Sequence, residues 1–127
     1  MNSVFVSYSR SDRLVAELLL QHLRYVGVTV WMDKSNLAAG EAISQSIRNA
    51  LAHSDAVVVV VSEQSLRSKW VQFEIGAAIG LGKKLLPVVV TDVGEAMPEF
   101  LQNVQWLDAR GKPLREVALE IERAIQS

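Results

Sequence analysis

The sequence predicts an α/β fold, built on a doubly wound parallel sheet of five strands with helices on both faces. The first observation is that short, apolar, β-favouring runs alternate with longer segments of helical periodicity along the chain. The second is the run Ala56–Val61, which contains no polar residue and is therefore typical of a central strand buried on both faces. Right-handed crossovers between successive strands then favour the flavodoxin-like strand order 2-1-3-4-5.

Each strand of this sheet is expected where a short apolar run is bounded by polar or turn residues. The fifth run is expected at an edge, because it is short and follows a looser segment that contains Pro98. In chain order, the expected strands are Val4–Tyr8, Val28–Met32, Ala56–Val61, Leu85–Val90 and Val104–Leu107.

Helices are expected between and after these strands, where apolar residues recur at helical spacing. Gly27 is expected to end the first helix and Pro113 to begin the last one, because glycine and proline favour those positions. The expected helices cover Asp12–Val26, the segment around Ile43–Leu51, Lys69–Leu81 and the segment from Pro113 to Ile125.

Composition and charge restrict the class of protein. Half of the residues are hydrophobic and 21% are charged, so we expect residues 1–127 to form a single packed domain, which a longer protein could contain. The chain has no cysteine, which excludes disulfides, thiolate metal sites and cysteine nucleophiles. A net charge of −1 and short apolar runs predict no nucleic-acid or membrane partner. Because no signal-peptide pattern opens the sequence, we expect a cytoplasmic protein.

Three familiar kinds of site do not fit the sequence. The glycines of Gly76–Lys84 have the wrong spacing for a phosphate loop and favour a helix C-terminus. A phosphoacceptor receiver domain would need acidic residues after the first and third strands, where this chain has Ser7–Ser9 and Ser62. His22 and His53 are expected late in helices, a poor position for a metal pair or a serine–histidine relay.

Trp70 and Glu74 are the residues that best fit a chemical site. They are four positions apart, so on a helix they project from one face. Their helix follows the valine-rich strand, which places its first turns at the crevice beyond the carboxyl ends of the strands. There the carboxylate could hold a sugar hydroxyl while a base or ribose packs on the indole ring. The spacing alone favours a simpler interpretation, with Trp70 in the core and Glu74 as a solvated helix residue.

Four segments, which together span most of the chain, occur in a characteristic order and at a characteristic spacing. The first is Val4–Ser9, the second is Gly27–Asp33 followed by Leu37–Gly40, the third is Ile47–Leu51 with Ser54, Val57–Ser62 and Ser68–Glu74, and the fourth is Leu86–Val89. On these segments the chain resembles the TIR (Toll/interleukin-1 receptor) family, in which an apolar strand ending in Ser-Tyr is followed by a second strand, a long "BB" loop, a central block and a further strand. The resemblance is closest to prokaryotic TIR effectors.

The resemblance implies a function for Glu74. Catalytic members of the family carry Trp-x-x-x-Glu on the third helix, and their glutamate cleaves the nicotinamide–ribose bond of NAD⁺. This chain is therefore expected to be an NAD⁺ glycohydrolase or cyclase (a NADase) that is active when self-assembled and serves prokaryotic antiviral defence. NAD⁺ is then the substrate, other TIR domains are the partners in a homo-oligomer or filament, and no cofactor is needed. The product, ADP-ribose or a cyclic form, stays open.

The resemblance also assigns residues around the substrate. Tyr8, Ser9 and Arg10 follow the first strand and could contact the ribose or phosphates, although Ser9 could instead cap a helix and Arg10 could lie in solvent. Trp31 and Asp33 could border the nicotinamide, or Trp31 could pack in the core. The BB loop is expected to act as a gate and an assembly surface, through Lys34, Leu37, Gly40 and Glu41.

Two other classes of function stay open. A non-catalytic TIR scaffold would recruit other TIR domains through the same loop, and Glu74 would then be an ordinary helix residue. An enzyme similar to nucleoside deoxyribosyltransferases would also place a glutamate in a flavodoxin-like fold, although the BB-loop pattern argues against it. Tests with NAD⁺ and with deoxynucleosides as substrates separate these classes.

Overall fold

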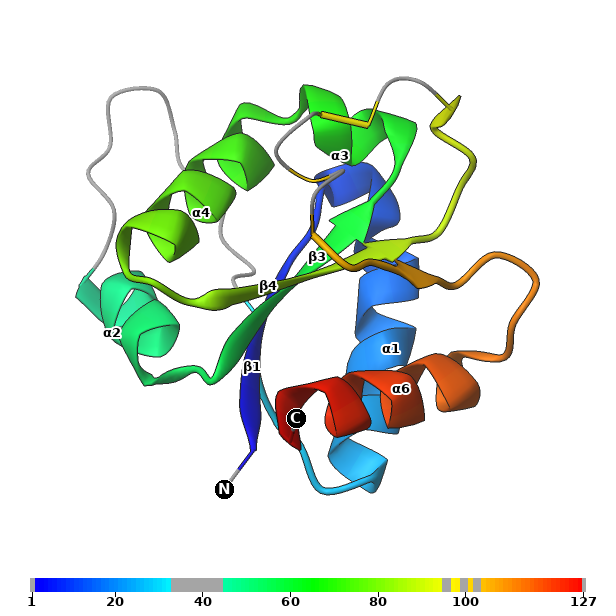
Figure 1. The fold of residues 1–127 in the computed structure, drawn as a ribbon, viewed down its shortest axis with the longest axis horizontal. Helices are drawn as coiled ribbons and strands as arrows, with labels where there is room; N and C mark the ends of the chain where they lie inside the picture. The colour runs from blue at the N-terminus through cyan, green and yellow to red at the C-terminus, as the bar shows by residue number, and fades with distance from the viewer. Residues whose placement is uncertain (1, 33–44, 95–96, 99–100, 102–103, 127) are drawn as a thin grey trace.

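The structure, a computed structural model, describes residues 2–32, 45–94, 97–98, 101 and 104–126 (Figure 1). Within these ranges five strands form one parallel sheet in the order β2-β1-β3-β4-β5, which confirms the predicted fold class and strand order. No helix in the same ranges is long and apolar enough to cross a membrane. Along the chain the elements are β1 (Ser3–Ser7), the 3₁₀ helix η1 (Arg10–Asp12), α1 (Arg13–Tyr25), β2 (Thr29–Met32), α2 (Gln45–His53), β3 (Ala56–Val61), α3 (Glu63–Arg67), α4 (Lys69–Gly80), β4 (Lys84–Val89), β5 (Leu107–Asp108) and α6 (Leu114–Gln126).

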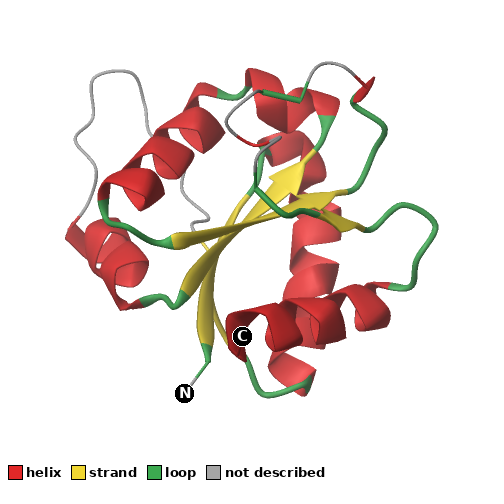
Figure 2. Ribbon diagram, in the orientation of Figure 1, coloured by secondary structure: helices red, strands yellow, loops and turns green. Residues whose placement is uncertain are grey.

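Helices cover both faces of the sheet (Figure 2). We name these the α1/α6 face and the α2/α4 face, after the helices that pack on each of them. Successive residues of a strand point to opposite faces. Val4 and Val58 therefore enter the core of the α1/α6 face, while Phe5 and Val57 enter the core of the α2/α4 face. This alternation decides which side chains of the strand ends can meet.

β3 is the central strand, as its apolar composition predicts. All six residues of Ala56–Val61 are buried, and β1 and β4 pair with this strand on either side. Burying a valine side chain contributes about 1.5–3 kcal/mol of hydrophobic free energy relative to leaving it exposed. The carboxyl ends of β1 and β3 are therefore held side by side by a strongly buried part of the sheet.

α1 ends at Gly27, as expected. Gly27 has a φ of +90°, and the two amides at the helix end donate back to the last turn: Val28 to the Leu23 carbonyl at 3.0 Å, and Gly27 to the Arg24 carbonyl at 3.1 Å. This is the Schellman arrangement, which needs a residue that tolerates positive φ. α4 ends in the same way at Gly82, with a φ of +69°, so the glycine-rich segment forms a helix C-terminus.

The fifth strand lies later in the chain than predicted. The expected strand Val104–Leu107 is wrong in its position, since only Leu107 and Asp108 pair with β4. The amide of Val104 instead donates to the carbonyl of Leu101 at 3.2 Å. The strand that pairs with β4 therefore begins at Leu107.

α3 is a short helix that the sequence analysis does not predict. It begins with reciprocal bonds: the Ser62 hydroxyl accepts from the Ser65 amide at 3.0 Å, and the Ser65 hydroxyl accepts from the Ser62 amide at 2.8 Å. This is a capping box with serine in place of the usual glutamate or glutamine. With five residues, the helix is too short for a helical period to show in the sequence. It leads the chain from the end of β3 into α4.

Candidate active site

Buried polar side chains gather where β1 and β3 end. The two strands are neighbours, but the helix after β1 packs on the α1/α6 face and the long helix after β3 packs on the α2/α4 face. This is a topological switch point, where ligands bind in sheets of this kind. Within the described residues, the buried polar side chains at these strand ends and in the helices that follow are Ser7, Ser9, Asp12, Ser62, Ser65 and Glu74.

Glu74 occupies a core position of α4. The buried residues of this helix, Val71, Glu74, Ile75 and Ala78, have the spacing of an apolar stripe, and Glu74 is only 1% exposed. A carboxylate that loses its water must be hydrogen-bonded or paired, because burying an isolated charge is strongly unfavourable. The interpretation of Glu74 as a solvated helix residue is therefore wrong.

Ser7 provides a hydrogen bond to this carboxylate. It is the last residue of β1, it is fully buried, and its side chain points to the same face of the sheet as that of Phe5, two positions earlier. The Ser7 hydroxyl donates to Oε1 of Glu74 over 2.7 Å. This distance is the ordinary one for a hydroxyl that donates to an oxygen acceptor. The bond joins the end of the first strand to the second turn of α4.

Asp12 is a second buried carboxylate, and it lies on the other face. Its Oδ2 accepts from the Ser9 hydroxyl at 2.8 Å and from the Ser62 hydroxyl. Ser62 follows β3 with extended backbone, so its side chain continues the strand alternation toward the α1/α6 face. Asp12 therefore ties the ends of β1 and β3 together on the side of the sheet opposite Glu74.

The sequence alone does not predict that Ser7, Asp12 and Ser62 belong to these networks. For Ser7 a signal exists: it is a polar residue at the end of an otherwise apolar strand that is predicted to be buried. A hydroxyl at such a position needs a partner inside the protein. The sequence does not say which side chain that partner is.

Trp70 lies one helical turn before Glu74. It is partly buried and packs against the core of the α2/α4 face, and its ring stacks with that of Phe73 at a centroid distance of 6.0 Å and an angle of 16°. Phe73 is 43% exposed, so the two rings form an aromatic surface near the start of α4. Trp70 packs against the core without being fully buried, and its role in binding substrate stays a prediction.

The three residues that follow β1 lie in different environments. Tyr8 is buried in the core of the α1/α6 face, and Arg10 is exposed. Ser9 is buried and does not cap a helix with its side chain, because its hydroxyl donates to Asp12. Contacts from Tyr8, Ser9 and Arg10 to a substrate stay predictions.

Trp31 lies on the same face of the sheet as Glu74. It is the register partner of Phe5 in the parallel pair of β1 and β2, so its side chain points to the α2/α4 face. It is 44% exposed, and the alternative that it packs in the core is therefore wrong. The remaining predicted residues, Asp33, Lys34, Leu37, Gly40 and Glu41, lie outside the described residues.

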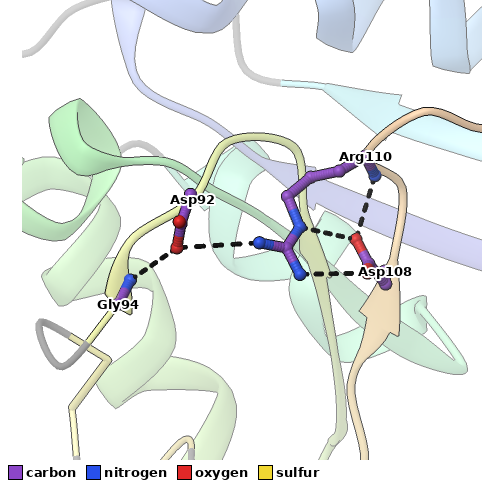
Figure 3. A network of polar contacts seen from close by, with 4 residues as sticks. All are labelled: Asp92, Gly94, Asp108 and Arg110. Carbon is purple, nitrogen blue, oxygen red and sulfur yellow. Dashed lines mark hydrogen bonds and ion pairs between the residues drawn. The ribbon is translucent and has the colours of Figure 1, made fainter.

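A third polar cluster lies at the carboxyl ends of β4 and β5 (Figure 3). The guanidinium of Arg110 donates to both carboxylate oxygens of Asp108, at 2.9 and 3.1 Å, and lies 3.6 Å from Asp92, which also accepts from the Gly94 amide. The hydrogen bonds from Arg110 lower the pKa of Asp108 to about 2. Trp106 and Arg110 line an adjacent cavity of about 260 Å³. The charges of this cluster therefore pair with one another.

The two histidines lie at helix ends, as predicted. His22 is in the last turn of α1, and His53 ends α2 with its Nδ1 atom 2.7 Å from the carbonyl oxygen of Asn49. In the described part of the chain, no group of three or more histidine, aspartate or glutamate side chains is arranged to hold a metal ion.

Comparison with known proteins identifies a family and several curated relatives. Residues 4–125 match the TIR domain family. NAD(+) hydrolase TcpA of Theionarchaea archaeon is 32% identical over 90 residues, which cover 67% of this chain and 27% of the relative. The 2′ cyclic ADP-D-ribose synthase AbTIR of Acinetobacter baumannii is 24% identical over 131 residues, which cover 96% of this chain and 48% of the relative. The chain therefore spans between about a quarter and a half of these relatives.

Solved structures share the fold. The TIR domain of the Toll-related receptor TRR-2 from Hydra magnipapillata has a TM-score of 0.77 at 23% identity, with 98% of both chains covered. The TIR domains of the activated Roq1 resistosome have a TM-score of 0.63 at 22% identity, with 98% of this chain and 72% of that chain covered. At such identities the structures bear on the fold alone. The family match over residues 4–125 and the shared architecture agree, and this chain belongs to the TIR domain family.

Proposed function

We propose that this chain cleaves the nicotinamide–ribose bond of NAD⁺ and that Glu74 is its catalytic carboxylate. The observation that carries the proposal is the buried hydrogen bond from Ser7 to Glu74 at the switch point of the sheet. A carboxylate in the apolar stripe of a helix disfavours folding, so its position is better explained by chemistry than by packing. Relatives named as NAD⁺ hydrolases and cyclic ADP-ribose synthases support the choice of reaction.

A single carboxylate is sufficient for this reaction. The nicotinamide ring of NAD⁺ is a cationic pyridinium, so when the bond to C1′ breaks, the electron pair moves to the ring nitrogen and nicotinamide leaves as a neutral molecule. No general acid is needed, unlike in ordinary glycosidases. What remains is a positively charged ribosyl centre, which the anionic side chain of Glu74 can stabilise. Water that adds to C1′ and loses a proton gives ADP-ribose, and attack from within the same molecule gives a cyclic product.

The burial of Glu74 bears on how the activity is controlled. The carboxylate is 1% exposed, so NAD⁺ can reach it only after neighbouring groups move. We propose that self-assembly stabilises the opened arrangement, because a contact made only by that arrangement shifts the equilibrium toward it. The isolated chain is then nearly silent. An effector of this kind suits prokaryotic antiviral defence in the cytoplasm, where assembly would switch on the loss of NAD⁺.

The deciding experiment measures NAD⁺ consumption by the full chain clustered on beads. Wild type is compared with Glu74→Ala and Glu74→Gln, and Glu116→Gln, an exposed glutamate on α6, serves as the matched control. Loss of the catalytic carboxylate is expected to reduce turnover at least about a hundredfold, the usual effect of removing one electrostatic stabiliser. Circular dichroism confirms folding, and chromatography identifies the product. Equal turnover in wild type and Glu74→Ala would exclude the role given to Glu74.

A TIR scaffold without catalysis is the second candidate. The observation that favours it is the set of large apolar side chains that α4 and its C-terminal cap leave exposed, namely Phe73 (43%), Ile79 (54%) and Leu81 (51%). Exposed apolar side chains mark an interaction surface where they form a contiguous patch. Failure of the clustered wild type to cleave NAD⁺, together with self-association that Ile79→Lys abolishes, would favour this function.

A further inference from the structure

The position of Ser7 is unusual for its residue type. The other residues of β1 that enter the two cores, Val4, Phe5 and Val6, are apolar, and Ser7 is as fully buried as they are. A buried hydroxyl lowers stability unless it is hydrogen-bonded, and an alanine or valine would pack at this position without that requirement. The hydroxyl of Ser7 therefore matters for the bond that it makes, which joins it to Glu74.

This bond restricts the orientation of the carboxylate. The terminal torsion of a glutamate side chain is broad, so a carboxylate that is held only at Cβ can turn. A donor 2.7 Å from Oε1 fixes one oxygen and with it the plane of the group. The donor also sits on a rigid support, because β1 is hydrogen-bonded to β2 on one side and to β3 on the other. Pre-organised groups on rigid elements are what electrostatic catalysis requires.

We propose that Ser7 is the positioning residue of the NAD⁺-cleaving site, acting through Glu74. Its hydroxyl holds Oε1 so that the carboxylate faces the positive charge that develops at C1′ of the nicotinamide ribose. This inference rests on the proposed function of Glu74. Ser7 need not touch the substrate, because its effect passes through the orientation of Glu74.

The chain offers a matched control for this role. Ser54 is also a buried serine, 1% exposed, and its hydroxyl donates to the carbonyl of Ala50 at 2.6 Å. It precedes β3, at the amino edge of the sheet, whereas Ser7 ends β1 at the carboxyl edge. Ser54→Ala therefore removes a buried serine hydroxyl without disturbing the carboxylate.

The test measures kcat and KM for NAD⁺ with the clustered full chain, in wild type, Ser7→Ala, Glu74→Ala, the double variant and Ser54→Ala. Ser7→Ala is expected to lower kcat at least about tenfold with KM nearly unchanged, since the lost bond orients a group that acts in the transition state. The double variant is expected to match Glu74→Ala, because Ser7 acts only through that carboxylate. Ser54→Ala is expected to keep the kcat of wild type.

A second pair of variants covers the case in which Ser7→Ala does not fold. The side chains introduced by Ser7→Thr and Ser7→Val have the same shape, but only threonine keeps the hydroxyl. The kcat of Ser7→Thr should therefore be higher than that of Ser7→Val. The positioning role is overturned if folded Ser7→Ala retains the kcat of wild type, or if the threonine and valine variants have the same kcat. It is also overturned if Ser7→Ala lowers the residual activity of Glu74→Ala by the same factor as it lowers that of wild type. Failure of the proposed function has a different signature, in which wild type and Glu74→Ala do not differ at all.

Discussion

The hydroxyl of Ser7 lies 2.7 Å from Oε1 of Glu74, although 67 positions separate the two residues in the sequence. The first residue ends the strand next to the centre of the sheet, and the second lies in the helix that crosses the α2/α4 face. Both side chains are buried, so their interaction is not weakened by water. The pair therefore contributes both to stability and to the proposed chemistry, and the two contributions can be measured separately.

Loss of the Ser7–Glu74 hydrogen bond should lower the free energy of unfolding. Ser7→Ala is expected to lower the free energy of unfolding by about 1.5–3 kcal/mol, the range for a hydrogen bond to a charged group. In a Glu74→Met background the same change should have little effect or be favourable, because no carboxylate then needs the donor. Urea unfolding of the four proteins in this cycle gives the coupling energy. Equal effects in both backgrounds would show that the two side chains do not interact in solution.

Asp12 is expected to contribute to the free energy of unfolding. Its Oδ2 accepts from the hydroxyls of Ser9 and Ser62, so Asp12→Ala leaves two buried hydroxyls without this acceptor. We expect a loss of about 2–4 kcal/mol in the free energy of unfolding. Glu63→Ala is the control, because Glu63 forms an exposed pair with Arg67 that is expected to contribute less than about 1 kcal/mol. Similar thermal unfolding curves for the two variants would contradict the network.

Replacing glycine by alanine should have opposite effects on stability at two positions that lie close together in the chain. Gly82 has a φ of +69° in the cap of α4, so Gly82→Ala is expected to cost about 1–2 kcal/mol. Gly76 lies inside α4, and a methyl group there would meet no atom within 4 Å. Gly76→Ala is therefore expected to stabilise the protein by about 0.5–1 kcal/mol. Melting temperatures check both signs, and a destabilising Gly76→Ala would contradict the described helix.

The Asp108–Arg110 pair should make a small contribution to stability that depends on pH. Folding lowers the pKa of Asp108 from its ordinary value of 3.8 to about 2, because Arg110 donates to its carboxylate. A pKa lowered by folding stabilises the protein above the unfolded value, and this contribution disappears as the pH falls from about 4 to about 2. The effect is small because the pair is exposed to solvent.

The variant Asp108→Asn tests this pH dependence. It should be slightly less stable than wild type near neutral pH, and the difference should shrink below about pH 4 and vanish near pH 2. Urea unfolding at several pH values measures it. A difference between the two proteins that does not change with pH would show that the ion pair is not formed.

The sequence predicts the elements that have a clear apolar pattern or a residue that favours an element end. The valine run Ala56–Val61 is buried as expected, and Gly27 ends α1, because composition and backbone freedom act locally at these places. The fifth strand is misplaced because the bond from the Val104 amide to the Leu101 carbonyl does not alter the apolar pattern. α3 is missed because its start depends on two serine hydroxyls and its five residues are too few for a helical period to be recognised in the sequence.

In the candidate site, too, some features follow from the sequence and others depend on the tertiary structure. The sequence by itself determines that a carboxylate, Glu74, follows Trp70 on a helix that begins beyond the carboxyl end of the central strand, because spacing and strand order are properties of the chain. Only the tertiary structure decides that Glu74 turns into the core, that Ser7 is its donor and that Tyr8 and Asp12 lie on the opposite face. The physical reason is that strand alternation and helix rotation choose the face of each side chain, and packing of the whole sheet then selects which distant groups meet.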